Sequence, residues 1–166
     1  NRLVDTDPMT GLYNRRYFDR KSEELIAAMA TNQQEFTLLI ADLDHFKNIN
    51  DTYGHDVGDK VIIAFANILT SEQGLADIAC RYGGEEFVLL LNCNLLDAKL
   101  VAERIRQKAQ ETYITIDEVQ TVQFTVSIGI HSVAHSSTTV KETLTVADKA
   151  LYKAKSNGRN CVEVAA

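Results

Sequence analysis

The sequence contains little that would interrupt one folded unit. It has one proline, Pro8, and eight glycines among 166 residues. It shows no low-complexity segment and no repeat period. A chain of this length can bury about 70% of its unfolded surface, so its core needs no disulfide or metal to be stable. We therefore expect residues 1–166 to form one domain.

Other absences exclude whole classes of protein. The 23 acidic residues outnumber the 17 lysines and arginines, and the formal net charge of −6 argues against a broad basic surface for nucleic acid. No apolar run reaches about 18 residues, so no transmembrane helix is predicted. The start shows no signal peptide. Because the chain begins at Asn1 rather than methionine, we expect an excised piece of a longer protein, whose targeting signals can lie elsewhere.

The cysteines and histidines do not indicate a metal site. Cys80, Cys93 and Cys161 are an odd number without CxxC spacing, which favours reduced thiols over a disulfide framework or a zinc site. The four histidines have no metal-ligand spacing either. We expect a domain exposed to the cytoplasm, in a full-length protein that can itself be anchored to a membrane.

Hydrophobic periodicity predicts alternating helices and strands. Helices are predicted over residues 14–30, around Val61–Leu69, over 97–112 with Asp97 as the cap, and from Val140 to Ala154; strands are predicted over 36–41, 78–82, 87–91, 122–130 and 161–164. The polar stretch 45–58 is expected to be a connection. Gly83-Gly84 has the chemistry of a hairpin turn between two strands.

The order of these elements predicts an α+β fold. A helix, a β-α-β-β-α-β core and a final α-β addition give a ferredoxin-like, mostly antiparallel sheet flanked by helices. The first and third strands are then antiparallel neighbours, so Asp42 and the turn 83–86 meet at one edge. The helix after the first strand begins there and brings Asp59 close. The last helix ends there and brings Lys155 and Arg159.

Carboxylates gathered at this edge suit Mg²⁺, which prefers oxygen ligands. Asp42 follows a buried strand, and Glu85 and Glu86 lie in a tight turn. Crowding them without a cation raises their pKa values, a conflict that a divalent ion removes. Taken alone, however, Asp42-Leu43-Asp44 also fits a strand-ending turn or a helix cap. Glu85-Glu86 alone also fits a solvated pair beside a hairpin.

The remaining residues at this edge also have two interpretations. Gly83-Gly84 is either an ordinary turn or a place where a phosphate-bearing substrate approaches the backbone. Lys155 and Arg159 either complement a helix C-terminus or clamp a polyphosphate. Asn50 and Asp59 are either loop and capping residues or an amide and a carboxylate that bind the edge of a guanine.

Four ordered segments of the sequence match one known pattern. They are residues 7–16, residues 42–59, Arg81-Tyr82-Gly83-Gly84-Glu85-Glu86-Phe87 and residues 147–160. Together they resemble the GGDEF family, the diguanylate cyclases, with Glu85 as a familiar variant of the name-giving aspartate. The resemblance covers the chain almost end to end. It implies the palm-type fold of nucleotide cyclases.

The resemblance implies that two GTP molecules are condensed into cyclic di-GMP, with release of two pyrophosphates, by two-metal phosphoryl transfer. It implies three catalytic acids, Asp42, Glu85 and Glu86. Asp42, the Leu43 carbonyl and Glu85 would hold Mg²⁺ or Mn²⁺, two ions in each half-site. The implied substrate-binding residues are Asn50 and Asp59 for guanine, Lys155 and Arg159 for the β- and γ-phosphates, Gly83 and Gly84 for close approach, and Phe46 and Lys47 beside them.

One edge of the sheet holds one GTP, so this chemistry needs two subunits facing each other. The resemblance and the stoichiometry together imply a homodimer as the active form. Family members usually carry an upstream sensory or receiver domain that arranges this dimer. Nucleic acid is not expected as a partner.

The family's inhibitory product site, RxxD, is incomplete in this sequence. Asp77 occupies the aspartate position, but Gly74 stands where the arginine would be. Cyclic di-GMP would therefore lose a bidentate, charge-assisted partner. The predicted topology places Asp77 at the far end of the sheet, away from the acidic edge. We expect weak or absent product inhibition through this remnant.

Two alternatives to an active cyclase stay open. One is a non-catalytic regulatory module that binds GTP or cyclic di-GMP, as degenerate members of the family do. The intact signature and the missing inhibitory arginine argue against it. The other keeps the fold but changes the reaction, to another nucleotide cyclase or to a dinucleotide with mixed bases. It is only partly excluded, because base choice depends on Asn50 and Asp59.

Overall fold

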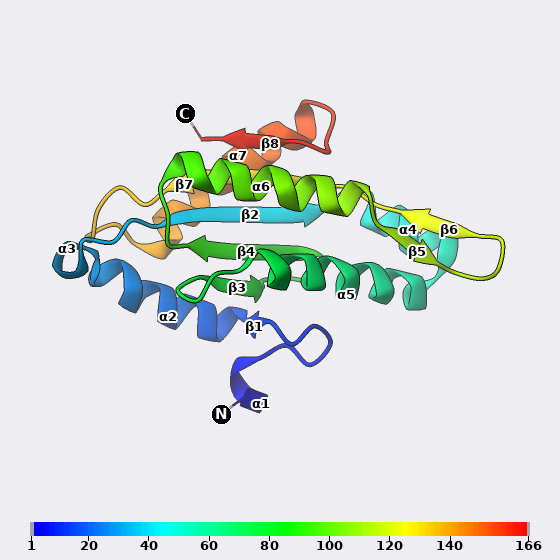
Figure 1. Cartoon of the computed structure of the whole chain (residues 1–166), viewed down its shortest axis with the longest axis horizontal. Helices are drawn as coiled ribbons and strands as arrows, with labels where there is room; N and C mark the ends of the chain where they lie inside the picture. Colours follow the sequence, from blue (N-terminus) through cyan, green and yellow to red (C-terminus); the bar gives the residue numbers. More distant parts are fainter. Residues whose placement is uncertain (1, 166) are drawn as a thin grey trace.

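A six-stranded sheet organises the computed structural model, which describes residues 2–165 (Figure 1). Its strands, in spatial order, are β1 (Tyr13–Asn14), β3 (Ile78–Arg81), β4 (Glu86–Leu91), β2 (Thr37–Leu43), β7 (Val126–Ser132) and β8 (Val162–Val164). The four central strands pair antiparallel, and β1 and β8 add to the two edges in parallel. This confirms the predicted ferredoxin-like α+β arrangement.

Helices cover both faces of this sheet. The helices of the described residues are α1 (Arg2–Asp5), α2 (Arg15–Ala27), α3 (Met29–Asn32), α4 (Phe46–Tyr53), α5 (His55–Glu72), α6 (Leu95–Gln110) and α7 (Val140–Ser156). One core, which includes Phe65 and Ile105, lies under α5 and α6, in front of the sheet in Figure 1. A second core, which includes Phe18 and Leu151, lies under α2 and α7 on the other face. No helix in the described part of the chain is long and apolar enough to cross a membrane.

Strand β2 lies at the centre of the sheet and is buried on both faces, as its apolar run predicts. Leu39 and Ala41 pack into the first core, whereas Leu38 and Ile40 pack into the second. The strand continues two residues beyond the predicted end at residue 41, through Leu43. Asp42 is therefore a strand residue, paired in register with Glu86 of β4, rather than the first residue of a turn.

Two predictions of local structure are wrong. Residues 45–58 are not a connection, because α4 and α5 occupy almost all of this stretch and meet at Gly54, whose φ is 94°. The predicted strand 122–130 is divided: β6 (Thr121–Gln123) pairs with β5 (Tyr113–Thr115) in a separate hairpin, and only β7 enters the main sheet. The hairpin projects beyond the end of the sheet (Figure 1).

Smaller differences concern helix ends. The helix predicted over 14–30 ends at Ala27, and the short α3 follows it. Asn94, not Asp97, caps α6: its side-chain Oδ1 accepts the backbone N–H of Asp97 at 2.9 Å. The short elements α1 and β1 were not predicted, because a few residues carry no periodicity. The three cysteines are free thiols, as expected.

Gly129 allows α7 to contact strand β7 directly. A Cβ at this position would lie 2.3 Å from the Ala147 carbonyl oxygen and 2.4 Å from the Leu151 nitrogen. We expect Gly129→Ala to lower the free energy of unfolding by at least about 2 kcal/mol, because the helix backbone must move away from the sheet. Urea denaturation would measure this. Gly84→Ala is the control, since an added Cβ there meets nothing within 4 Å. Equal stability of both variants would contradict the prediction.

Candidate active site

Three carboxylates and one ammonium group meet where β2 ends and β4 begins. Asp42 pairs with Glu86 across the two strands, and the Leu43 N–H donates to the Glu85 carbonyl at 3.3 Å. Helix α7 ends at the same edge, where Lys155 Nζ donates to Asp42 Oδ2. The topology predicted from sequence therefore brings these residues together as expected.

The electrostatics of this edge favour an added cation. Burial raises the pKa of Glu85, and the nearby Asp42 raises it further, while Lys155 opposes the shift. Burial also raises the pKa of Glu86, helped by Asp42 and Asp148. Burial and neighbouring negative charges destabilise the charged form of these carboxylates, and a divalent ion would relieve the repulsion between them.

The donor groups at this edge fit a hard divalent ion such as Mg²⁺. Asp42 Oδ2 is occupied by Lys155, but Asp42 Oδ1 is buried and has no hydrogen-bond partner. In residues 2–165, no group of three or more His, Cys, Asp or Glu side chains is arranged as a ready-made metal site. The ligand set expected here is not such a group of three side chains, because it combines two carboxylates with the backbone carbonyl of Leu43.

A cavity of about 400 Å³ lies beside the acids. It is lined by Phe46, Lys47, Asn50, His55, Asp59, Ile62, Arg81, Gly84 and Glu85. Asn50 comes from α4 and Asp59 from α5, so the two helices that replace the predicted connection form its wall. Asn50 Oδ1 is buried and unpartnered. Gly58 makes this placement possible, because a Cβ there would lie 1.8 Å from that oxygen.

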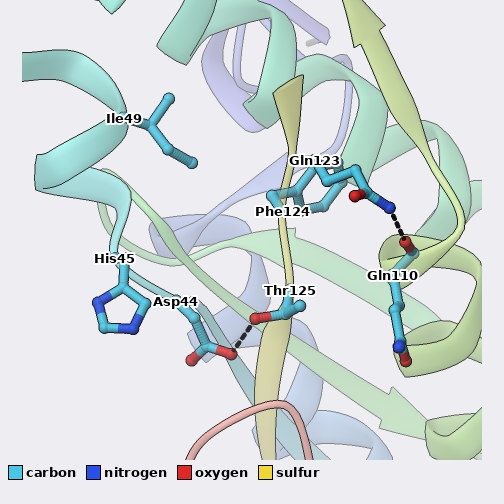
Figure 2. A pocket seen from close by; sticks show the side chains of 7 residues that line it. All are labelled: Asp44, His45, Ile49, Gln110, Gln123, Phe124 and Thr125. Carbon is cyan, nitrogen blue, oxygen red and sulfur yellow. Dashed lines mark hydrogen bonds between the residues drawn. The ribbon is translucent and has the colours of Figure 1, made fainter. Parts of the chain in front are cut away.

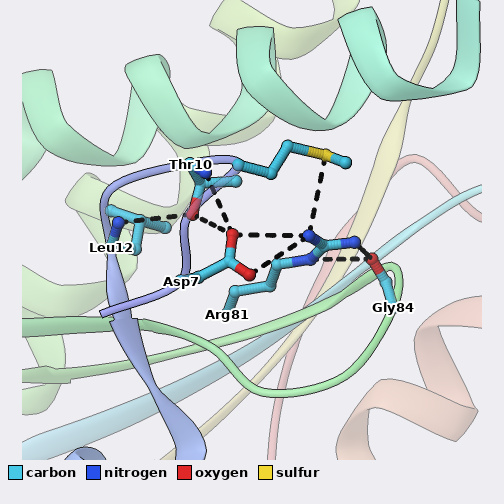
Figure 3. A network of polar contacts seen from close by, with 6 residues as sticks. Asp7, Thr10, Leu12, Arg81 and Gly84 are labelled. Carbon is cyan, nitrogen blue, oxygen red and sulfur yellow. Dashed lines mark hydrogen bonds and ion pairs between the residues drawn. The ribbon is translucent and has the colours of Figure 1, made fainter. Parts of the chain in front are cut away.

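Sequence reasoning missed three residues that line this cavity, His55, Ile62 and Arg81. His55 had a signal, since it lies in the matched segment 42–59. Arg81 had one too, since it begins the motif that ends at Phe87. Its Nε and Nη2 donate to the Gly84 carbonyl at 3.1 and 2.8 Å, and its Nη1 lies 3.3 Å from Asp7 Oδ2 (Figure 3). Asp7 also accepts the N–H and hydroxyl of Thr10. The N-terminal turn therefore braces the turn that contains Gly83 and Gly84.

Three predicted residues lie outside this arrangement. Gly83 is in the turn next to Gly84, but it does not line the 400 Å³ cavity. Arg159 follows α7 with an exposed side chain and a φ of 64°, and it is not among the residues that line the 400 Å³ cavity. Asp77 precedes β3 at the opposite end of the sheet, as predicted. Its carboxylate accepts the backbone N–H groups of Gly74 and Asn92 at 2.7 and 2.8 Å.

The raised pKa of Glu86 predicts a pH dependence of stability. A carboxyl group whose pKa is raised in the folded state stabilises the fold when the pH is below its ordinary pKa of about 4.5. This contribution to stability is lost as the pH rises through the pKa of the folded state. We expect Glu86→Gln to melt at a higher temperature than the wild type near pH 7 without divalent ions. The difference should vanish toward pH 4.

Melting curves between pH 4 and pH 8 would measure this difference. Glu118→Gln is the control, because Glu118 is exposed in the loop between β5 and β6. A Glu86→Gln variant that is less stable than the wild type across the whole range would contradict the prediction.

The fold and site define an α+β domain with three carboxylates at one edge of its sheet, beside a cavity of about 400 Å³. The family model described as "Diguanylate cyclase, GGDEF domain" matches residues 4–161, and the chain belongs to this family.

Named relatives agree with this assignment. The chain is 43% identical over 164 residues to Diguanylate cyclase A of Treponema denticola and 40% identical over 162 residues to Response regulator PleD of Caulobacter vibrioides. Each match covers 96% of this chain but only 44% and 36% of the relatives, so the chain spans less than half their length. The crystal structure of diguanylate cyclase SiaD in complex with its activator SiaC from Pseudomonas aeruginosa superposes with a TM-score of 0.92, at 35% identity over 99% of this chain and 63% of that chain.

Proposed function

We propose that this domain is a diguanylate cyclase that condenses two GTP molecules into cyclic di-GMP and releases two pyrophosphates. The observation that carries the proposal is the meeting of Asp42, Glu85, Glu86 and Lys155 beside the cavity that contains Asn50. Two buried oxygens in this region, Asp42 Oδ1 and Asn50 Oδ1, have no partner within the protein. A metal-bound guanine nucleotide would satisfy both of them.

The walls of the cavity support a role in binding the base. The Asp59 carboxylate can accept the two adjacent N–H donors of guanine, and the Asn50 amide can bind its neighbouring polar edge. Phe46 offers an apolar ring, and Lys47 a positive charge, on the same wall. Gly84 leaves open space for the ribose and phosphates, since an added Cβ there would meet nothing within 4 Å.

The acids would hold the metal ions. Asp42, the Leu43 carbonyl and Glu85 would bind Mg²⁺ or Mn²⁺, two ions in each half-site. Such ions polarise the α-phosphate and stabilise the leaving pyrophosphate. Glu86, whose pKa is raised by burial and by the nearby Asp42, lies next to this set and would support metal binding or the attacking hydroxyl.

Two cations of the C-terminal segment would hold the triphosphate. Lys155 faces Asp42 in the structure, which places its ammonium group at the edge where the phosphates would lie. Arg159 is exposed just beyond the end of α7, and it would bind the outer phosphates through its bidentate guanidinium. Together they neutralise charge on the β- and γ-phosphates.

One half-site holds one GTP, so the proposed reaction requires a homodimer with two half-sites facing each other. In the full-length protein, an upstream sensory or receiver domain would arrange this dimer. The nucleotide substrate and free thiols suit a domain exposed to the cytoplasm. The missing arginine of RxxD would leave the enzyme without strong product inhibition at Asp77.

The proposal is tested by incubating the concentrated domain with GTP and Mg²⁺ and separating the nucleotides by chromatography. We expect cyclic di-GMP from the wild type and from Glu118→Ala, and none from Glu85→Ala. The rate per chain should fall on dilution, because the active form is a dimer. Absence of product at every concentration, even with the chains joined into a dimer, would contradict the proposal. Products from ATP would indicate a different base specificity.

A further inference from the structure

Asp44 is a buried carboxylate that the proposed mechanism does not use. It is only 4% exposed, and three hydrogen-bond donors converge on it. Ser127 Oγ donates to Oδ1 at 2.7 Å, and Thr125 Oγ1 donates to Oδ2 at 2.7 Å. The backbone N–H of Asn160 donates to the same Oδ2 at 3.0 Å. Figure 2 shows the carboxylate turned toward Thr125 at the edge of a surface cavity of about 380 Å³.

The bond to Asn160 holds a turn with unusual backbone geometry. Gly158, Arg159 and Asn160 have φ values of 109°, 64° and 48°, so three consecutive residues have positive φ. Residues other than glycine rarely adopt this conformation, and it persists only where surrounding contacts fix it. Two other hydrogen bonds also hold this turn. The Arg159 N–H donates to the Ala154 carbonyl at 3.0 Å, and Arg106 Nη1 donates to Asn160 Oδ1 at 3.1 Å. Arg159 is the central residue of this turn.

The same carboxylate is fixed to the acidic edge. Asp44 directly follows Leu43, whose N–H bonds to the Glu85 carbonyl. The Asp44 N–H donates to the Thr125 carbonyl at 2.9 Å, which anchors the residue to the start of β7. The next residue, His45, has a φ of 54°. Asp44 therefore connects the backbone at the acidic edge with the backbone that carries Arg159, 115 residues away in the sequence.

We infer that Asp44 is a positioning residue, which holds the turn 158–160 so that Arg159 faces the outer phosphates of the bound nucleotide. This inference rests on the proposed function and adds a residue to it. Asp44 does not touch the substrate; it acts through the Asn160 N–H. Its loss should therefore weaken the binding of a triphosphate and leave the binding of a monophosphate almost unchanged.

The test compares the binding of 3′-deoxy-GTP, which lacks the attacking hydroxyl, with that of GMP, by calorimetry in Mg²⁺. Asp44→Ala should bind 3′-deoxy-GTP about tenfold more weakly, the effect of losing one charge-assisted contact, and GMP within about twofold. If Asp44→Ala does not fold, Asp44→Ser is used instead, because the serine side chain is too short for its hydroxyl to accept the Asn160 N–H. Arg159→Ala should lower the affinity for 3′-deoxy-GTP similarly, and the double variant Asp44→Ala/Arg159→Ala should lose little more.

Two matched variants separate positioning from general stability. Asp44→Asn should retain the preference for the triphosphate, because its amide oxygen can accept the Asn160 N–H while its nitrogen donates to Ser127. Ser127→Ala removes one bond to the carboxylate without touching Asn160, so it should also retain the preference.

The inference would be overturned if Asp44→Ala or Asp44→Ser bound 3′-deoxy-GTP and GMP equally more weakly, or bound both as tightly as the wild type does. Strictly additive losses of affinity for 3′-deoxy-GTP in the double variant would also overturn it. So would a loss of this affinity in Asp44→Asn as large as in Asp44→Ala. If the wild type forms cyclic di-GMP but binds 3′-deoxy-GTP no more tightly than GMP, this inference fails and the proposed function stands. If the wild type forms no cyclic di-GMP at any concentration, even with the chains joined into a dimer, the proposed function itself fails.

Discussion

Replacing Asp42 with asparagine should lower the rate of cyclic di-GMP formation by about a thousandfold or more. Asp42 is the only one of the three clustered acids that contacts Lys155 through one oxygen and leaves the other buried and unpartnered. The variant preserves the shape of the side chain but removes its charge. A hard divalent ion binds an amide oxygen more weakly than a carboxylate, so both the metal and the metal-bound triphosphate should be lost.

The same substitution should have little effect on stability. Asp42 raises the pKa of both Glu85 and Glu86, and removing its charge relieves that repulsion. The lost ion pair with Lys155 offsets part of this gain, but the lysine side chain is 32% exposed, and such pairs contribute modestly. We expect the free energy of unfolding at pH 7 to change by less than about 1 kcal/mol.

Initial rates from chromatography and urea denaturation of the same preparation would test both parts. Glu118→Gln is the control for the loss of one acidic charge elsewhere. An Asp42→Asn variant with a tenth of the wild-type rate or more would contradict the assignment of Asp42 to the metal site. An unfolded variant would contradict the expected stability, and Asp42→Ser would then be assayed for activity instead.

The central fold could be predicted because burial on both faces leaves a strong sequence pattern. Strand β2 is an apolar run, and helices α5 and α7 carry apolar residues at helical spacing. The prediction failed for α4, in which only Ile49 is buried. That helix is held by its contact with α5, where Gly58 lies against Asn50. A contact between two helices is not visible in the period of either one.

The divided strand shows a second limit of periodicity. Val122, Phe124 and Val126 are all buried, so alternation continues without interruption across the break between β6 and β7. The pattern correctly indicates which side chains face a core, yet it does not say which strand each backbone segment pairs with. Here the pairing partner of β6 is β5, whose three residues bury only Ile114 and give no signal of their own.

The acidic edge could be predicted from topology, since strand direction alone brings Asp42, Glu86 and Lys155 to one end of the sheet. Asp44 could not. In the sequence it is a polar residue after a buried strand, a place where turns and caps are common. Its hydrogen bond to Asn160 spans 116 residues and depends on how α7 ends. Residues that act through the backbone of a distant segment leave no local pattern.

The far end of the sheet offers the second large effect, a gain rather than a loss. Asp77 there accepts the N–H groups of Gly74 and Asn92, so its carboxylate is fixed in place but has no cationic neighbour among its hydrogen-bond partners. Gly74 is not in the left-handed region, and an added Cβ would meet only the Asp77 carboxylate, at 3.0 Å from Oδ2. A larger side chain at this position therefore requires only a small movement of Asp77.

Gly74→Arg should consequently bind cyclic di-GMP at least about tenfold more tightly than the wild type, because it adds a bidentate, charge-assisted partner for the phosphates and guanines of the product. Calorimetry of both proteins would measure this, and initial rates with added product should show inhibition only in the variant. Gly74→Gln is the matched control, since it adds similar bulk without charge, and Asp77→Ala in the Gly74→Arg background should abolish the gain. Tight binding of cyclic di-GMP by the wild type that disappears in Asp77→Ala would show instead that the remnant suffices, since the carboxylate and its two backbone donors would then bind the product without an arginine.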